Sequence, residues 1–179
     1  MKKLLIVCMF LLVGGSANAA LITFGPSSAS GSGPTISFNN LVVPSTITGN
    51  ATVTLSVNGD FNSNFEYLDI LFDAFSLGRV FDGNTANDLF NFAGDIGNQS
   101  RSTLTGVAII SAADFAALIS DGLLNLSFDS SSRVNCCGTI NVLSGSISYD
   151  SKPVPAPSTI VLFSLVLLGG VYMTRKRKA

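Results

Sequence analysis

Hydrophobic and polar residues alternate along much of the chain between residues 20 and 152, and this two-residue period is typical of strands with one buried face. The clearest segment is 51–57, where Ala, Val, Leu and Val lie on one face and Thr, Thr and Ser on the other. Segments 68–72 and 124–128 repeat the pattern, each with a Phe as its last inward residue. We expect further strands at 21–24, 35–43, 77–81, 88–93, 102–110 and 139–149.

The segment 139–149 changes phase in its middle. Its hydrophobic residues follow one alternation up to Val142 and the opposite alternation from Leu143 onward. The two sets cannot share a buried face unless a β-bulge or a bend lies between them. The sequence therefore predicts an irregularity in this strand.

One segment departs from the strand pattern. Ser111 to Asp114 resembles the capping box that begins a helix, and Asp121-Gly122 supplies a stop. The hydrophobic residues between them share one helical face: Phe115, Leu118 and Ile119. We expect a short helix of about ten residues here.

The order of these elements predicts the fold class. Clusters of Gly, Pro, Asn, Asp and Ser separate the expected strands and mark turns. Eight or nine short strands and one helix predict an all-β fold, namely a jelly-roll-like two-sheet sandwich at residues 20–152. Eleven of the thirteen phenylalanines lie in this region, and we expect most of them in its core.

Composition excludes several classes of function. The 179-residue chain has no His and no Trp, which removes imidazole-dependent hydrolysis and His-ligated zinc or iron sites. Glu66 is the only Glu, and no spacing among it and the ten Asp selects a carboxylate pair for glycoside hydrolysis, so we expect no enzyme. Between residues 20 and 152, four basic and eleven acidic residues give a net charge of −7. Such a surface repels phosphate backbones, so we expect no nucleic-acid partner.

Residues 1–19 have the parts of a secretory signal peptide. Two lysines near the start precede a ten-residue apolar run at 4–13, and the small residues Ala17 and Ala19 precede a cleavage point before Ala20. The alternative is an uncleaved anchor, but the run is much shorter than the roughly 20 residues that a spanning helix needs. We expect export and cleavage by signal peptidase.

The other end of the chain, residues 153–179, is also distinctive. Its proline-rich start includes Pro155, Ala156, Pro157 and Ser158. An uncharged stretch at 159–174 follows, and the chain then has a basic tail of Arg175, Lys176, Arg177 and Lys178. Sixteen residues form a helix of roughly 24 Å, which is short for a hydrocarbon core of about 30 Å. We expect a short transmembrane helix whose basic tail stays on the cytoplasmic side.

A proline motif, Ser-Thr, a short apolar helix with a Gly pair and a terminal basic cluster together resemble the PEP-CTERM sorting signal. The resemblance implies recognition by an exosortase, a membrane transpeptidase-like protease of Gram-negative bacteria whose exported proteins are associated with exopolysaccharide. It further implies an inner-membrane intermediate followed by the cell surface or extracellular matrix. Ala156 departs from the family, which usually has Glu there. The alternative is an ordinary single-pass anchor, for which the prolines form a stiff linker.

A polar segment after the strand at 51–57 is a candidate calcium site. Oxygen-bearing side chains alternate there as at the start of a calcium loop: Asp60, Asn62, Asn64 and Glu66. The match is partial, because an EF-hand would have Gly where Phe65 stands and an acid where Leu71 stands. The alternative is a polar hairpin turn, which Asn-Gly-Asp favours through its backbone angles. We expect no cofactor apart from this possible structural calcium.

Cys136 and Cys137 are the only cysteines that remain once the signal peptide is removed. Export to an oxidising compartment disfavours free thiols. Adjacent cysteines bridge only through a strained eight-membered ring, for which the neighbouring Ser and Gly residues supply flexibility. We expect this vicinal disulfide, and the alternatives are pairing with another copy or two buried free thiols.

Two classes of function remain. The first is a non-catalytic surface or extracellular-matrix protein, sorted by an exosortase, whose Ser-, Thr- and Asn-rich strand faces contact polysaccharide, partner proteins or other copies. The second is a carbohydrate-binding module or glycan-active enzyme displayed at the cell surface. The missing Trp and the count of only three Tyr weigh against the second class. We therefore expect the first.

Overall fold

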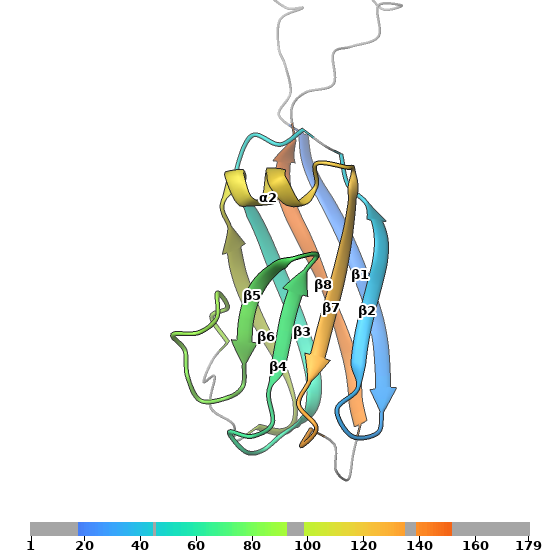
Figure 1. Ribbon diagram of the computed structural model, residues 1–179, viewed down its shortest axis with the longest axis vertical. Coiled ribbons are helices and arrows are strands. Elements are labelled where there is room, and N and C mark those ends of the chain that lie inside the picture. Colours follow the sequence, from blue (N-terminus) through green and yellow to red (C-terminus); the bar gives the residue numbers. More distant parts are fainter. Residues whose placement is uncertain (1–17, 45, 93–98, 135–138, 152–179) are drawn as a thin grey trace, which may run out of the picture. The chain divides into compact units, whose positions relative to one another are not determined.

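The computed structural model describes residues 18–44, 46–92, 99–134 and 139–151, and this part of the chain contains eight strands and one helix (Figure 1). In chain order the elements are β1 (Asn18–Ser30), β2 (Thr35–Val42), β3 (Ala51–Phe61), β4 (Leu68–Phe72), β5 (Phe75–Val80), β6 (Gln99–Ile110), α2 (Ala112–Leu118), β7 (Leu123–Ser130) and β8 (Thr139–Ser151).

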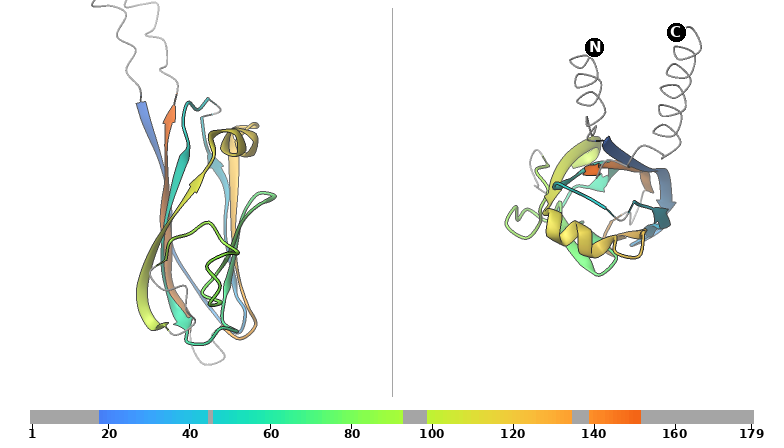
Figure 2. Two further views of the ribbon diagram at one scale, coloured as in Figure 1. Left: turned by 90° about the vertical axis from the view of Figure 1, so that its left-hand side faces the viewer. Right: turned by 90° about the horizontal axis from the view of Figure 1, so that it is seen from above.

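The strands form two four-stranded antiparallel sheets that face each other (Figures 1 and 2). Sheet A has the strand order β1-β8-β3-β6, and sheet B has the order β2-β7-β4-β5. Each strand lies in the other sheet from the strand before it, except that β5 follows β4 within sheet B, and this is the connectivity of a jelly roll. The predicted jelly-roll-like sandwich with one short helix is confirmed.

The alternation of the sequence sets which face of each strand is buried. Every second residue of β3, from Ala51 to Phe61, is buried, and the residues between them are partly exposed. The inward residues of β4 and β7 are at most 1% exposed: Leu68, Ile70, Phe72, Leu124, Leu126 and Phe128. Each such side chain contributes about 1.5–3 kcal/mol through removal of apolar surface from water. The two inner faces thus form one core, which includes eight of the phenylalanines.

The predicted irregularity in the last strand is present. Ile140 and Leu143 of β8 are both fully buried although they are three residues apart. They lie opposite Ala29 and Ser27 of β1, which are only two residues apart. The extra residue in β8 is therefore a bulge, and it returns the second half of the strand to the buried phase.

One predicted strand is absent, and the limits of another are wrong. The segment 88–93 is not a strand in its described part and makes only isolated bridges, such as Phe90 to Ala108. The Asp88 carboxylate accepts the Phe90 N–H at 2.6 Å and so turns the backbone locally. β1 is also longer than the predicted 21–24, because it continues past Gly25 through two register shifts against β8.

The predicted helix begins directly after its capping residue Ser111 but ends at Leu118, before the predicted stop at Asp121-Gly122, and is therefore shorter than expected. The Ser111 hydroxyl accepts the Asp114 N–H at 3.2 Å, and α2 then spans seven residues. Phe115 and Ile119 are fully buried, and Gly122 has a φ of +81° beyond the last turn. α2 lies at the end of the sandwich where β8 ends, which we call the proximal end (Figure 1).

The predicted signal peptide lies partly outside the described residues. Residues 1–17, including Ala17, are not described, whereas Ala19 and Ala20 belong to β1 and pair with Asp150 and Tyr149 of β8. The predicted cleavage point therefore lies inside a sheet strand. In the described part of the chain, no helix is long and apolar enough to cross a membrane.

We predict that Tyr149→Phe stabilises the sandwich. The Tyr149 ring packs 5.2 Å from that of Phe115, and its buried hydroxyl has no hydrogen-bond partner among the described residues. Removing an unsatisfied hydroxyl should raise the free energy of unfolding by about 1 kcal/mol, as measured by urea titration. Tyr149→Ala should instead lower it by about 3–5 kcal/mol, because it leaves a cavity.

The same variant should change the alkaline part of the stability profile. Burial raises the pKa of Tyr149 above its ordinary value of 10.0. In the unfolded chain the Tyr149 hydroxyl loses its proton at a lower pH than in the folded chain. The free energy of unfolding therefore falls as the pH rises above about 10 and through the higher pKa of the folded state. Tyr149→Phe should lack this loss. An equal alkaline loss in both proteins would contradict the assignment.

Candidate functional site

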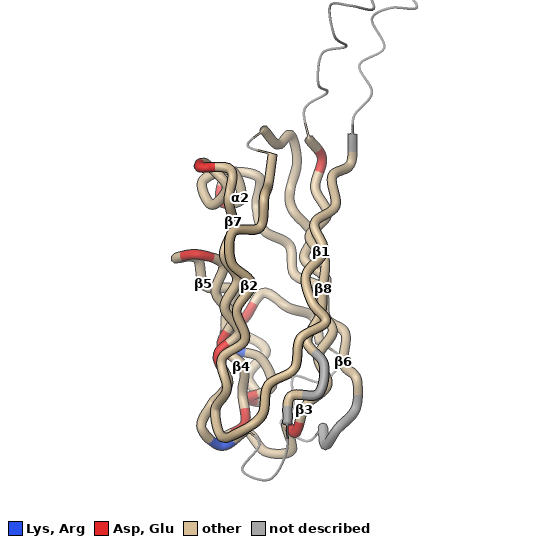
Figure 3. Tube along the Cα trace, turned by 90° about the vertical axis from the view of Figure 1, so that its right-hand side faces the viewer, with Lys and Arg blue, Asp and Glu red and all other residues tan. Residues whose placement is uncertain are grey.

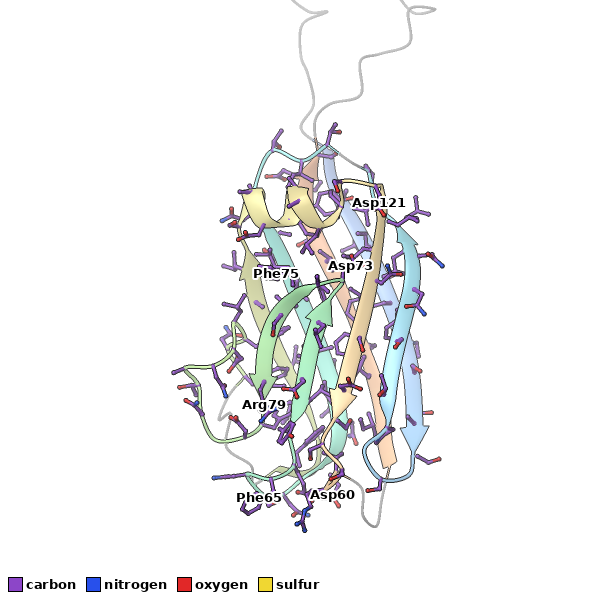
Figure 4. The ribbon with its side chains drawn as sticks, viewed as in Figure 1. Asp60, Phe65, Asp73, Phe75, Arg79 and Asp121 are labelled. Atoms are coloured by element: carbon purple, nitrogen blue, oxygen red, sulfur yellow. The ribbon has the colours of Figure 1, made fainter. Side chains whose placement is uncertain are left out.

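The loop that joins β3 to β4, residues 62–67, lies at the end of the sandwich opposite the proximal end. We call it the distal loop. Figure 4 shows Asp60 and Phe65 at this end, far from the point where β8 ends. The strands that flank the loop are held in different sheets, so the loop crosses from sheet A to sheet B.

The distal loop is closed by Glu66. This side chain is only 7% exposed, and its carboxylate accepts the Asn62 N–H at 2.6 Å. The Glu66 N–H in turn donates to the Ser63 carbonyl at 2.9 Å. A buried carboxylate is stable here because it receives a backbone N–H and links the two ends of the loop.

A second segment fixes the loop from the other side. The Ser131 hydroxyl donates to the Phe65 carbonyl at 2.7 Å, and the Ser131 N–H donates to the Tyr67 carbonyl at 3.0 Å. Ser131 is itself 7% exposed. The backbone around Phe65 is therefore held by hydrogen bonds from both sides, and those bonds leave it little freedom to turn inward.

Phe65 nevertheless points its ring into solvent, with 75% of its surface exposed. Polar side chains lie on the same loop: the Asn62 amide donates to the Asp60 carboxylate at 2.7 Å, and Asn64 lies against Gly83 of the loop after β5. Single exposed apolar residues are common in proteins. This one differs because its backbone is fixed, so the ring is presented at little further entropic cost.

The structure places three of the predicted calcium ligands in the distal loop and Asp60 near the end of β3, and two of their carboxylates accept hydrogen bonds from protein donors. Asp60 accepts from Asn62, and Glu66 accepts from a backbone N–H. Within the described ranges, no three or more His, Cys, Asp or Glu side chains gather as a metal site. These contacts fit the alternative of a polar turn, and the calcium site stays a prediction.

A cluster on the outside of sheet B was missed by the sequence analysis. The Asp69 carboxylate receives two N–H groups of Arg79, at 2.8 and 2.9 Å, and the Arg79 guanidinium lies 3.6 Å from the centre of the Tyr67 ring. The hydrogen bond that Arg79 donates to Asp69 raises the pKa of Arg79 further above its ordinary value. Because both side chains are more than a third exposed, the pair stabilises the fold by at most about 1 kcal/mol.

This cluster depends on strand register. Asp69 and Arg79 are register partners on β4 and β5, and Asp129 of β7 lies on the other side of Asp69. Asp69 and Asp129 both lie at outward positions of their strands, and the register of β4 and β7 makes them neighbours. Asp69 accepts hydrogen bonds from Arg79, and Asp129 accepts one from the hydroxyl of Thr35.

The outward side of sheet A has a different character. Most residues of its central rows are small hydroxyl residues, and the other outward residues of these rows are Leu21, Val107 and Ile109 at the edges. We call the hydroxyl residues the hydroxyl face: Thr23, Thr52, Thr54, Ser56, Thr105, Ser144, Ser146 and Ser148. Figure 3 shows that the described charged positions gather on sheet B, α2 and the loops. On sheet A, Asp60 and Asp150 lie beyond the two ends of these rows.

The remaining predicted site residues lie outside the described residues. They are Cys136 and Cys137, the sorting motif Pro155, Ala156, Pro157 and Ser158, and the basic tail Arg175, Lys176, Arg177 and Lys178. The vicinal disulfide therefore stays a prediction. The family model of the PEP-CTERM protein-sorting motif matches residues 153–178. No curated protein and no solved structure matches the chain.

We predict that the Glu66 carboxylate is required for the shape of the distal loop. Glu66→Ala leaves the Asn62 N–H without its acceptor and should lower the free energy of unfolding by about 1–3 kcal/mol. Glu66→Gln keeps an acceptor oxygen and should cost less. Thermal unfolding of the three proteins measures the difference, and equal losses for both variants would contradict this role.

The same variants test the calcium prediction. A bound calcium ion would stabilise the folded state by mass action, so adding calcium should raise the unfolding temperature of the wild type. Glu66→Gln removes a charged ligand and should abolish that rise. If calcium and a chelator leave the wild-type unfolding temperature equal, the polar turn is the correct interpretation.

Proposed function

We propose that the chain, whose residues 153–178 match the PEP-CTERM sorting motif read by an exosortase, is a non-catalytic surface or matrix protein that associates with exopolysaccharide. The observation that carries the proposal is the fixed, exposed Phe65 at the end of the sandwich opposite the proximal end, where β8 ends. The proposed route is export by the signal peptide, an inner-membrane intermediate and release to the surface.

The sorting motif begins close to the folded sandwich. β8 ends at Ser151, and the matched motif starts at residue 153. The seven residues from 152 to 158 include three prolines, and an extended proline-rich chain spans about 3.1 Å per residue, or roughly 22 Å in total. An accessible, extended segment of this kind is what a protease at the membrane surface requires.

The distal loop lies at the other end of the long strands. β8 has 13 residues, and at about 3.4 Å per residue it spans roughly 44 Å. A sandwich attached through its proximal end therefore presents Phe65 on the side directed away from the attachment point. This orientation supports contact with material outside the cell.

The chemistry of the distal loop suits an uncharged sugar ring. The C–H face of a pyranose packs on an aromatic ring, and the amides of Asn62 and Asn64 can both donate to and accept from sugar hydroxyls. The net charge of −7 in residues 20–152 repels an acidic polymer. We therefore propose a neutral exopolysaccharide as the partner.

Replacement of Phe65 tests this proposal. Phe65→Ala should weaken association with the host's isolated exopolysaccharide about tenfold, because truncating an exposed aromatic anchor costs more than 1 kcal/mol. Val42→Ala is the matched control, because Val42 is 78% exposed and is the last residue of β2, away from the distal loop. Co-sedimentation measures binding. Unchanged binding by Phe65→Ala, or an equal loss in both variants, would refute the role of the distal loop.

The basic tail tests the sorting mechanism. Replacing Arg175, Lys176, Arg177 and Lys178 with Gln should impair membrane retention and sorting, because the positive charges hold the tail on the cytoplasmic side. The sandwich itself should stay folded. The direct measurement is the C-terminal peptide of the mature surface protein by mass spectrometry. In a host with a working exosortase, intact surface protein ending at Ala179 would instead establish the ordinary anchor.

A further inference from the structure

The hydroxyl face is an exposed surface without charge on a chain segment that is strongly acidic. Residues 20–152 carry a net charge of −7, and none of the described outward residues in the rows of this face is charged. Two copies of the chain would repel each other through their acidic surfaces. We propose that two copies attached to the same membrane associate through the hydroxyl face.

The composition of the rows supports this partner. In the row nearest the proximal end, register places Leu21 of β1 beside Ser148 of β8, then Thr52 of β3, then Ile109 of β6. Leu21 is 66% exposed and Ile109 is 60% exposed. The row thus has a large apolar residue at each edge and two hydroxyls in the centre, and it has the same pattern when taken in either direction.

A two-fold axis parallel to the strands makes this row complementary to itself. Rotation about such an axis exchanges the two edges of the sheet, so Leu21 of one copy faces Ile109 of the other. The hydroxyls of Ser148 and Thr52 face each other in the same way. This is an isologous interface, in which the same patch serves both copies, and aligned packing within about 30° is a common arrangement of two sheets.

The same axis agrees with the place of the sorting motif in the sequence, directly after β8. A rotation about the strand direction keeps the proximal ends of both copies, at which β8 ends, on one side of the dimer. An axis across the strands would place the two proximal ends on opposite sides and would pair unlike rows. Attachment to one membrane therefore selects the arrangement in which Leu21 meets Ile109.

The size of the face predicts a weak dimer. Four strands about 4.8 Å apart and three rows about 6.8 Å apart give a footprint of roughly 400 Å² per copy, or about 800 Å² in total. This is below the roughly 1,000 Å² of a stable specific interface and in the range of weak, transient contacts. Confinement of both copies to one membrane raises their effective concentration, so the dimer should form there and dissociate in dilute solution.

Selective crosslinking of the full chain in cells tests the proposal. Two differently tagged chains, one with Leu21→Cys and one with Ile109→Cys, are co-expressed in a Cys136→Ser, Cys137→Ser background. Facing sheets lie about 10 Å apart, so a bifunctional maleimide spanning about 8 Å joins the thiols of Leu21→Cys and Ile109→Cys. Each variant alone should give at least tenfold less crosslinked dimer, because its own two thiols lie on opposite edges.

A charge at the centre of the face provides the second measurement. Thr54→Lys places two ammonium groups near the axis and should reduce the mixed crosslink at least tenfold. Ser127→Lys, at an outward position in sheet B, is the matched control and should leave it unchanged. The proposal is overturned if no mixed crosslink forms, or if either cysteine variant alone gives as much crosslinked dimer as the mixture. It is also overturned if Val42→Cys gives the same crosslink yield as Leu21→Cys, or if Thr54→Lys leaves the yield of the mixed crosslink unchanged.

Discussion

The pairing of β8 with both β1 and β3 is the contact on which the rest of the structure depends. β8 is the last strand of the sandwich, yet it is an inner strand of sheet A, between the first strand and the third. Sheet A is therefore incomplete until almost the whole exported segment has emerged, and such non-local pairing folds slowly. The predicted signal cleavage point lies in the part of β1 that pairs with β8. Cleavage at the predicted point would therefore have to precede this pairing.

The sequence predicted the faces of the strands better than their limits. Period-two alternation in β3, β4 and β7 identified the buried residues, because burial depends on which side of a strand a side chain lies. Limits and register depend on partners far away in the chain. The turn residues after Phe24 suggested a loop, but β1 continues there because β8 pairs with it across two register shifts. The segment at 88–92 alternates correctly and still forms no strand, because Asp88 turns its backbone.

The same distinction applies to the distal loop. Its polar residue types were evident, and they suggested calcium because carboxylates and amides alternate between Asp60 and Glu66. The structure directs these groups first to nearby N–H donors, which a residue pattern alone does not reveal. Most phenylalanines of the sandwich were expected in the core, and the sequence did not single out Phe65 as an exposed one. Its exposure depends on Ser131, which follows β7 and binds the loop from a distant part of the chain.

The edges of the sandwich explain why association should use a face. An unpaired edge strand is the usual route for one sheet to join another. Here β1 and β2 are each interrupted by register shifts, β5 has a register shift and a close approach of Asp88 to Gly78, and Phe90 bridges to the edge strand β6. Each irregularity disrupts the regular row of N–H and C=O groups that another strand would need. With irregular edges, and with the acidic groups of sheet A confined to the two ends of its rows, the uncharged face of sheet A is the surface on which two copies meet with the least electrostatic cost.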